Sequence, residues 1–268
     1  MDHMDQNFIA QHWYASIYDQ FENFTHDVAF LLKVLSEQTD RKSLKILEVA
    51  CGTGRICIPL AEAGHAVTGF DLSEAALLRC LAKGKDLPNL TLYRADALAE
   101  GWGEGYDVVV LAGNVFMNIE GAGDYAQAQR LFLRRASDAL RSGGHLYLDF
   151  DVHQEPNAFA GDIKTSSYFT GTDELGTTGR TIRYGTSADP VQRLWMGTGH
   201  IELTLANGQP LMIPDNWRKY IPTMPQILDW LAEAGLTASR TYRDFTDAPV
   251  EVDAQESFRA TIWAVKER

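Results

Sequence analysis

A glycine-rich turn near residue 50 is the part of this sequence best suited to binding a ligand. It reads Glu48-Val-Ala-Cys-Gly-Thr-Gly54, with a short apolar run before it and a helical pattern after it. Glycine tolerates positive φ and lets a ligand approach the backbone closely. Asp71 ends the next apolar run, 19 residues after Gly52, where a carboxylate would accept hydrogen bonds from ribose hydroxyls. This spacing predicts a nucleoside-containing ligand at the first crevice of an α/β sheet.

Two other nucleotide-binding loops fit this turn less well. The dinucleotide fingerprint Gly-x-Gly-x-x-Gly needs a third glycine, and Cys57 occupies that position. A P-loop needs Gly-Lys-Ser or Gly-Lys-Thr after the turn, and neither follows. A nicotinamide cofactor therefore stays as an alternative that titration with NAD would decide.

The segments around the turn alternate between strand and helix. Short apolar runs predict strands, and the segments between them have helical periodicity and capping residues. The expected strands are 45–50, 65–70, 90–94, 107–112 and 145–151, with helices over about 55–64, 73–84 and 124–140 and a turn over 142–144. After residue 220 the pattern returns, with a helix over 223–235 and strands over 236–244 and 257–266. This alternation predicts a doubly wound, Rossmann-like α/β fold with a seven-stranded, mostly parallel sheet.

Residues 155–220 break this pattern. Their strand-like pieces, 164–170, 180–184, 192–196, 200–205 and 210–213, are separated by Gly, Asp, Pro and Asn, and Asn207-Gly208 is a strong hairpin signal. About 65 residues is too long for a structureless loop in a compact domain, so we expect an inserted antiparallel β sheet. The chain would then consist of an N-terminal helical lid over 1–43, a ligand-binding core over 44–154 and 221–268, and a substrate lid over 155–220.

Five motifs together resemble the class I S-adenosylmethionine-dependent methyltransferases. They are Glu48–Gly54, Gly69-Phe-Asp-Leu-Ser73, Arg94-Ala-Asp-Ala97, Asp107–Asn114 and Leu140-Arg-Ser-Gly-Gly144, in the family's order and spacing over residues 44–151. The resemblance implies S-adenosyl-L-methionine as the cofactor. Carried over position by position, the cofactor-binding residues would be Glu48, Ala50, Gly52, Gly54, Asp71, Leu72, Asp96, Ala97, Leu98 and Asn114.

The resemblance also implies a role for several of these residues. The two glycines would let the methionine and ribose portions pass close to the backbone, and Asp71 would hold the ribose hydroxyls. Leu72 would pack on the adenine ring. Asp96 would accept from the adenine amino group, with a turn-forming Asp as the alternative. Glu48 would anchor the glycine loop indirectly or simply cap it.

The insertion and the aromatic N-terminal segment resemble small-molecule N-methyltransferases that act on amino sugars or on glycine and sarcosine. In those enzymes a small antiparallel sheet roofs the active site. We therefore expect methyl transfer to nitrogen of a small molecule. The alternatives are an O-methyltransferase of a small metabolite and a non-catalytic, S-adenosylmethionine-binding regulatory partner. Residues 114–117 read Asn-Val-Phe-Met, so the Asn/Asp-Pro-Pro-Tyr motif of enzymes that methylate DNA or protein glutamine is missing.

Several side chains are candidates for catalysis or for binding the acceptor. A general base is needed only when the acceptor is a protonated amine or a hydroxyl. His153, just beyond the fifth strand, His200 in the insertion and Tyr18 are the catalytic candidates, although each could instead be a structural residue. Two converging arginines would bind a carboxylate or phosphate. The candidate substrate-binding residues are Tyr14, Arg193, Trp195 and Arg218, with Arg183 as a further insertion arginine.

The composition restricts the partners and the compartment. Thirty-six acidic residues against 24 basic ones give a net charge of −12, which disfavours nucleic acid and anionic membrane surfaces. Three cysteines without a Cys-x-x-Cys pair disfavour a disulfide framework and a structural zinc site, so we expect no metal ion. We see no signal peptide and no apolar run that could span a membrane. We expect a cytoplasmic monomer or homodimer whose partner is a small-molecule methyl acceptor.

Overall fold

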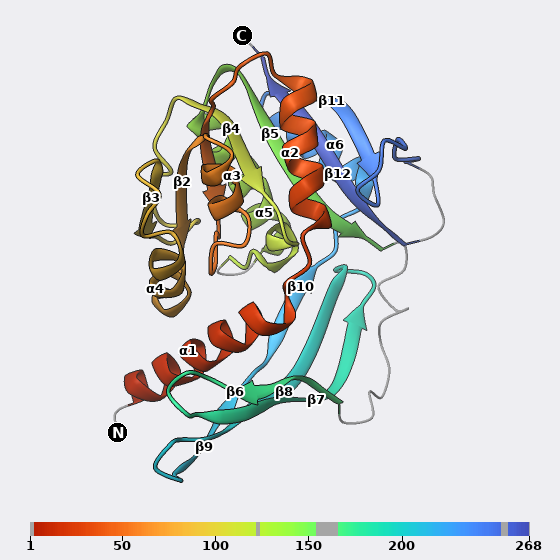
Figure 1. Cartoon of the computed structure of the whole chain (residues 1–268). Helices are drawn as coiled ribbons and strands as arrows, with labels where there is room; N and C mark the ends of the chain where they lie inside the picture. Colours follow the sequence, from red (N-terminus) through yellow and green to blue (C-terminus); the bar gives the residue numbers. More distant parts are fainter. Residues whose placement is uncertain (1–2, 122–123, 154–165, 253–256, 268) are drawn as a thin grey trace.

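The computed structural model describes residues 3–121, 124–153, 166–252 and 257–267 of the chain (Figure 1). Its larger sheet has seven strands in the order β11-β12-β5-β4-β1-β2-β3. The strands from β3 to β5 are parallel, and β12 is antiparallel to both of its neighbours. The predicted seven-stranded, mostly parallel sheet is therefore confirmed. Its strands are β1 (Lys45–Val49), β2 (Ala66–Asp71), β3 (Leu90–Arg94), β4 (Tyr106–Leu111), β5 (Leu140–Val152), β11 (Leu236–Arg243) and β12 (Phe258–Lys266).

Helices cover both faces of this sheet (Figure 1). In β4, Val108 and Val110 pack with α2, α3 and α4, whereas Val109 and Leu111 pack with α5 and α6. Because successive side chains of a strand point to opposite faces, a strand that is apolar at nearly every position is buried on both sides. The helices are α2 (His26–Gln38), α3 (Cys57–Glu62), α4 (Glu74–Lys83), α5 (Tyr125–Ala139) and α6 (Met224–Glu233), and a short 3-10 helix, η1 (Val115–Asn118), follows β4.

Two predicted boundaries in the core were wrong. The helix after the glycine loop begins at Cys57, because the turn continues past Gly54, which has φ +91°. The predicted turn over 142–144 lies inside β5, where the register against β4 shifts between Tyr106 and Val108. A Cβ on Gly144 would lie 3.0 Å from the carbonyl oxygen of Tyr106, so a glycine at this irregularity lets the two strands stay close.

The insertion forms a second, antiparallel sheet, as predicted. Its strands are β6 (Ser166–Thr172), β7 (Thr178–Asp189), β8 (Leu194–Thr204), β9 (Pro210–Pro214) and β10 (Trp217–Tyr220). They follow the order β10-β8-β7-β6, and β9 pairs with β8. Asn207-Gly208 makes the predicted β8–β9 hairpin, with Gly208 at φ +82°. Residues 154–165, which include the start of the first predicted piece, lie outside the described residues.

The pieces predicted over 192–196 and 200–205 are one continuous strand, and β10 was not predicted. Gly197 and Gly199 suggest a break between those pieces. In the structure both glycines stay in β8, because the Trp217 ring lies where a side chain of Gly197 would be, and the carbonyl of Ile182 lies where one of Gly199 would be. Glycine inside a strand often marks such a close approach.

The N-terminal helix α1 (His3–Phe21) lies between the two sheets (Figure 1). Trp13 and Ile17 are buried against Phe169 of β6 and Leu203 of β8. On its other side, Asp19 accepts hydrogen bonds from the glycine loop and from α4, which tie α1 to the core. None of the helices in the described part of the chain is long and apolar enough to cross a membrane.

Candidate functional site

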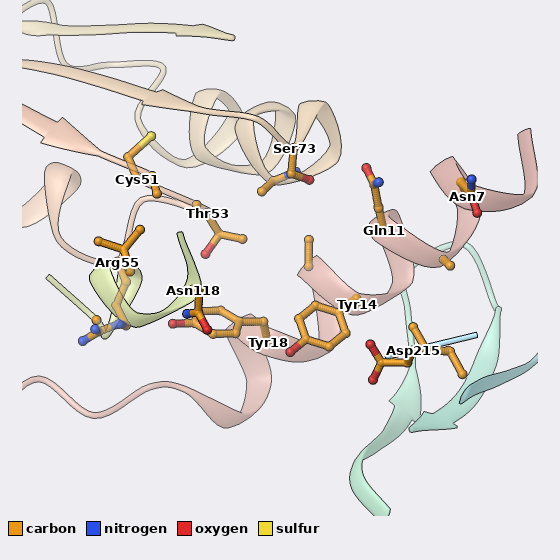
Figure 2. Close-up of a pocket in the computed structure, with 18 of the residues that line it drawn as sticks. Asn7, Gln11, Tyr14, Tyr18, Cys51, Thr53, Arg55, Ser73, Asn118 and Asp215 are labelled. Atoms are coloured by element: carbon orange, nitrogen blue, oxygen red, sulfur yellow. The ribbon is translucent and has the colours of Figure 1, made fainter. Parts of the chain in front are cut away.

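A cavity of about 750 Å³ lies where the glycine loop, α1 and the inserted sheet meet (Figure 2). This volume is within the range of small-molecule sites. Its lining comes from α1 (Asn7, Ala10, Gln11, Tyr14, Ala15, Tyr18), the glycine loop (Glu48, Ala50, Cys51, Gly52, Thr53, Arg55, Ile56), the start of α4 (Ser73, Ala76), the segment after β4 (Ala112, Gly113, Val115, Asn118) and the insertion (Ile201, Ile213, Pro214, Asp215).

The two glycines of the loop have different surroundings. Gly52 has φ +55°, and a Cβ built on it would meet nothing within 4 Å, so its backbone is open to the cavity. A Cβ on Gly54 would lie 2.5 Å from Sγ of Cys80, so this glycine lets the loop pack against α4. Ala50 also lines the cavity and has φ +57°. The loop therefore presents backbone to a ligand at its first glycine and packs on protein at its second.

Asp71, at the end of β2, is hydrogen-bonded to the glycine loop. Its Oδ2 accepts a hydrogen bond from the backbone N–H of Gly52 at 2.8 Å, and its Oδ1 accepts one from Ser73 at 2.8 Å. Burial raises the pKa of Asp71, and these backbone N–H groups oppose the shift. Each carboxylate oxygen can accept two hydrogen bonds, so the group keeps capacity for further donors. The Leu72 side chain, next in sequence, is 60% exposed.

Glu48 is a buried carboxylate at the loop end of the cavity. Its Oε2 has no hydrogen-bond partner in the described structure, and burial raises the pKa of Glu48 to about 8. An unpartnered buried acceptor is costly unless a donor reaches it. An ammonium group, such as that of the methionine portion of S-adenosylmethionine, would supply one.

The residues expected to bind the adenine, from the family resemblance, lie outside the cavity lining. Oδ1 of Asp96 accepts hydrogen bonds from the backbone N–H groups of Leu98 at 2.8 Å and Ala99 at 3.3 Å, as in a turn. The carbonyl oxygen of Ala97 accepts from Nε1 of Trp102 at 2.9 Å. These contacts shape the turn after β3, and the predicted adenine contact stays a prediction.

Asn114 shapes the opposite side of the cavity through its backbone. It has φ +63°, and its amide bridges to β5: Nδ2 donates to Oδ2 of Asp151, and Oδ1 accepts from the Asp151 N–H at 2.8 Å. Its neighbours Gly113 and Val115 line the cavity, whereas Asn114 itself does not.

The aromatic residues of α1 face the cavity. Figure 2 shows Tyr18, Tyr14, Gln11 and Asn7 of α1 among the residues that line the cavity. Burial raises the pKa of both Tyr14 and Tyr18. Asp215 next to Tyr14 raises the pKa of Tyr14 further, and Arg183 opposes it. Both phenols are therefore hydrogen-bond donors at neutral pH.

Other predicted residues are engaged elsewhere. His200 is hydrogen-bonded through Nδ1 to the Tyr184 hydroxyl and through Nε2 to Glu202 at 2.8 Å, all within the inserted sheet. Arg193 donates to the carbonyl oxygens of Ile221 at 2.5 Å and His153 at 3.0 Å.

The remaining predicted residues also lie outside the cavity lining. Nδ1 of His153 is 3.4 Å from the Ser257 hydroxyl. Arg218 donates to the Tyr125 hydroxyl at 3.0 Å, and the ring of Trp195 packs edge-on against Trp217 at 4.6 Å. Of the four residues predicted to bind the acceptor, Tyr14 lines the cavity, whereas Arg193, Trp195 and Arg218 do not.

Sequence reasoning missed several cavity residues. Arg55 directly follows the glycine motif, so its position in the sequence could have identified it as a residue of the site. Its Nη1 donates to both carboxylate oxygens of Asp27 of α2, at 2.7 and 2.8 Å, and its Cζ lies 4.9 Å from the centre of the Phe24 ring. Asn118 and Asp215 had no sequence signal, because their approach to the loop depends on the packing of η1 and of the inserted sheet.

Known proteins share this architecture. A family model described as a methyltransferase domain matches residues 47–146. A putative methyltransferase of Geobacillus sp. (strain WCH70) is 28% identical over 262 residues, covering 93% of this chain and 96% of that protein. Glycine N-methyltransferase of Rattus norvegicus is 29% identical over 151 residues, covering 52% of this chain and 50% of that protein. A sugar N-methyltransferase from Streptoalloteichus sp. has the same fold, with a TM-score of 0.69, 18% identity and coverage of 93% and 90%.

The observed geometry fits S-adenosylmethionine as the cofactor. The open backbone at Gly52, the remaining acceptor capacity of Asp71 and the unpartnered oxygen of Glu48 lie around one loop. The matched domain over 47–146 contains all three residues. The domain match, the similar sequences and the shared fold together support a class I S-adenosylmethionine-dependent methyltransferase.

Proposed function

We propose that this enzyme transfers a methyl group to a nitrogen atom of a small molecule bound in the cavity. The observation that carries the proposal is Asp215. Its side chain lines the cavity beside Tyr14 (Figure 2), and its carboxylate has no hydrogen bond or ion pair with the residues that the structure describes. An ionised carboxylate only accepts hydrogen bonds, so it suits the N–H donors of an amine.

The titratable groups around the cavity favour nitrogen over oxygen. A hydroxyl acceptor needs a general base during attack, whereas an amine needs only to be neutral. The described cavity lining contains no histidine and no lysine, and burial raises the pKa of Tyr14 and Tyr18, which keeps both phenols protonated. A neutral amine attacks through its lone pair, so its proton stays on the ammonium product until water takes it up, and Asp215 can accept a hydrogen bond from that N–H. The glycine and sugar N-methyltransferases among the similar proteins support the same acceptor atom.

The other residues position the reactants. S-adenosylmethionine supplies a methyl group on a sulfonium carbon that is already activated for displacement. The glycine loop and Asp71 hold the cofactor, while Tyr14 and Tyr18 exclude water from above it. We propose that residues 1–43 and 155–220 form the cover over the site. Alignment of the reacting atoms at about 3–3.5 Å is then the main contribution of the protein.

A screen of pooled metabolites tests this function. The purified enzyme is incubated with S-adenosylmethionine and each pool, and products heavier by one methylene are fragmented to locate the added methyl. We expect an N-methylated product. The Asp215→Asn variant should lower kcat/KM roughly 10²-fold with unchanged cofactor affinity. Asp86→Asn, at an exposed carboxylate outside the cavity lining, is the matched control.

Other outcomes would contradict the proposal. An O-methylated product would assign the oxygen alternative. Tight cofactor binding with no product from any pool would favour the regulatory partner instead.

A further inference from the structure

Two cations on one face of the inserted sheet have no acidic partner among the residues that the structure describes. Arg183 of β7 lies opposite Gly199 of β8. On the other side of β8, Lys219 of β10 lies opposite Trp195, and Trp217 lies opposite Gly197. Directly opposed residues of antiparallel strands, and residues two apart along a strand, share a face. Arg183, Trp195, Trp217 and Lys219 therefore form one surface, called here the cationic face.

Aromatic rings flank both cations. Cζ of Arg183 lies 4.8 Å from the centre of the Tyr168 ring and 5.8 Å from that of Trp217. Nζ of Lys219 lies 5.6 Å from Trp195 and 5.7 Å from Trp217. Cation–π contacts stabilise a charge but satisfy none of its N–H donors.

The N–H donors of these two cations have no acceptor in the described structure. Nε of Arg183 is buried without a hydrogen-bond partner. Lys219 is partly buried, and its burial lowers the pKa of its ammonium group. Neither side chain forms an ion pair or hydrogen bond with any described residue. A partly buried cation with unused donors is costly in the free protein, so a bound anion would relieve the cost.

The neighbouring carboxylates do not pair with Arg183 or Lys219. Asp151 is engaged by Arg259 and Asn114. The backbone N–H of Asp215 donates to the Gly199 carbonyl oxygen at 3.0 Å, which places Asp215 across β8 from Arg183, but its carboxylate is not within ion-pair distance of that arginine.

The cationic face borders the acceptor end of the cavity. Arg183 and Asp215 both act electrostatically on the hydroxyl of Tyr14, which lines the cavity. Because Gly199 has no side chain, nothing projects from β8 between Arg183 and Asp215. A small molecule in the cavity can therefore present one group to Asp215 and another to Arg183.

We propose that Arg183 and Lys219 bind an anionic group, a carboxylate or a phosphate ester, of the methyl acceptor. The proposal rests on the proposed function, because it names the class of acceptor for the same site. The Arg183 fork matches either oxyanion in a bidentate fashion, and Lys219 adds a second charge. An acceptor with an amine and an acidic group could place the amine at Asp215 and the acidic group at Arg183 and Lys219. Such a molecule needs local cations, because the whole chain carries a net charge of −12.

Anion titration of the full-length protein tests the site directly. The protein is saturated with S-adenosylhomocysteine and titrated with inorganic phosphate or with acetate at constant ionic strength. The indole N–H signals of Trp195 and Trp217 and the Nε–H signal of Arg183 are followed by NMR. We expect saturable shifts of these signals. Tighter binding of phosphate would indicate a phosphate ester, and tighter binding of acetate a carboxylate.

Matched variants decide whether the titrated anion uses these residues. Arg183→Gln and Lys219→Gln should each weaken anion binding by about tenfold or more. Arg180→Gln is the control, since Arg180 is on the same strand but is paired with Glu202. Arg183→Lys keeps the charge, so its anion affinity should lie between those of the wild type and Arg183→Gln. This variant can be measured in place of Arg183→Gln if the latter unfolds. Equal anion affinity in the wild type and both Gln variants, or no saturable binding of either anion, would overturn the proposal.

A second experiment separates this proposal from the proposed function. A metabolite extract is divided by anion exchange into anionic and non-anionic fractions, and methyl transfer is measured in each. Methylation in the anionic fraction that is lost in Arg183→Gln supports the site. Methylation only in the non-anionic fraction overturns it and leaves the methyltransferase function intact. If neither fraction is methylated, the proposed function fails and the anion titration alone decides the site.

Discussion

Replacing Asp71 tests whether the carboxylate at the end of β2 holds the cofactor. Its two oxygens already accept hydrogen bonds from the backbone N–H groups of Gly52 and Ser73, each at 2.8 Å. With two lone pairs on each oxygen, the group retains capacity for two more donors, which matches two ribose hydroxyls. Asp71 therefore has both a structural and a binding role, and two variants are needed to separate them.

The expected magnitudes follow from these bonds. A hydrogen bond to a charged group contributes about 1.5–3 kcal/mol, equivalent to roughly 10–150-fold in a binding constant. Asp71→Asn keeps the shape but replaces one acceptor by a donor, so we expect cofactor affinity to fall about tenfold or more. Asp71→Ala also leaves the N–H groups of Gly52 and Ser73 without this partner, which should lower the free energy of unfolding by about 1–3 kcal/mol.

Calorimetric titration with S-adenosylmethionine and urea unfolding measure the two effects. Asp86→Asn, an exposed carboxylate in the turn after α4, should change neither. Unchanged affinity in Asp71→Asn would remove Asp71 from the cofactor site. Affinity lost only in Asp71→Ala, together with stability, would leave Asp71 a purely structural role.

Two further predictions concern the glycine loop. Burial raises the pKa of Glu48 from 4.5 to about 8, so the folded protein binds more protons than the unfolded chain in this window, and the Glu48 contribution to stability falls as pH rises. Glu48→Gln should remove a slope of up to about 1.4 kcal/mol per pH unit between these values, and equal slopes in urea unfolding across this range would contradict the prediction. Gly54→Ala should destabilise the fold by about 2–5 kcal/mol through its positive φ and its contact with Cys80, whereas Gly52→Ala, with open space around it, should cost only about 1–2 kcal/mol. Equal losses of unfolding free energy would show that the packing of Gly54 does not matter.

The core elements could be predicted because their signals are local. The predicted helix starts at Ser73 and Thr223 are set by side chains that accept hydrogen bonds from N–H groups three residues ahead, and both of these hydrogen bonds are present. The continuous apolar run of β4 reports burial on both faces, which a parallel sheet between helices imposes. Thr25 precedes α2 in the same way, but its side chain makes no capping hydrogen bond.

The presence of an inserted antiparallel sheet could be predicted, but the exact bounds of its strands could not. The Asn207-Gly208 turn is a local signal and was correct. The continuity of β8 was not predictable, because glycine inside a strand is tolerated only where another group fills the space, and here that group is the Trp217 ring from a strand 20 residues away in sequence.

By itself, the sequence determined the βαβ core, the glycine loop and the acid at the end of β2, because these lie within one supersecondary unit whose geometry depends on short-range backbone rules. The tertiary structure decided which polar side chains lie at the cavity or beside it. Arg183, Arg193 and Arg218 are the same residue type in one insertion, yet Arg193 bonds to carbonyl oxygens, Arg218 bonds to Tyr125, and Nε of Arg183 has no hydrogen-bond partner among the described residues. Strand register and sheet packing set which way each side chain points, and neither is encoded in the neighbouring residues alone.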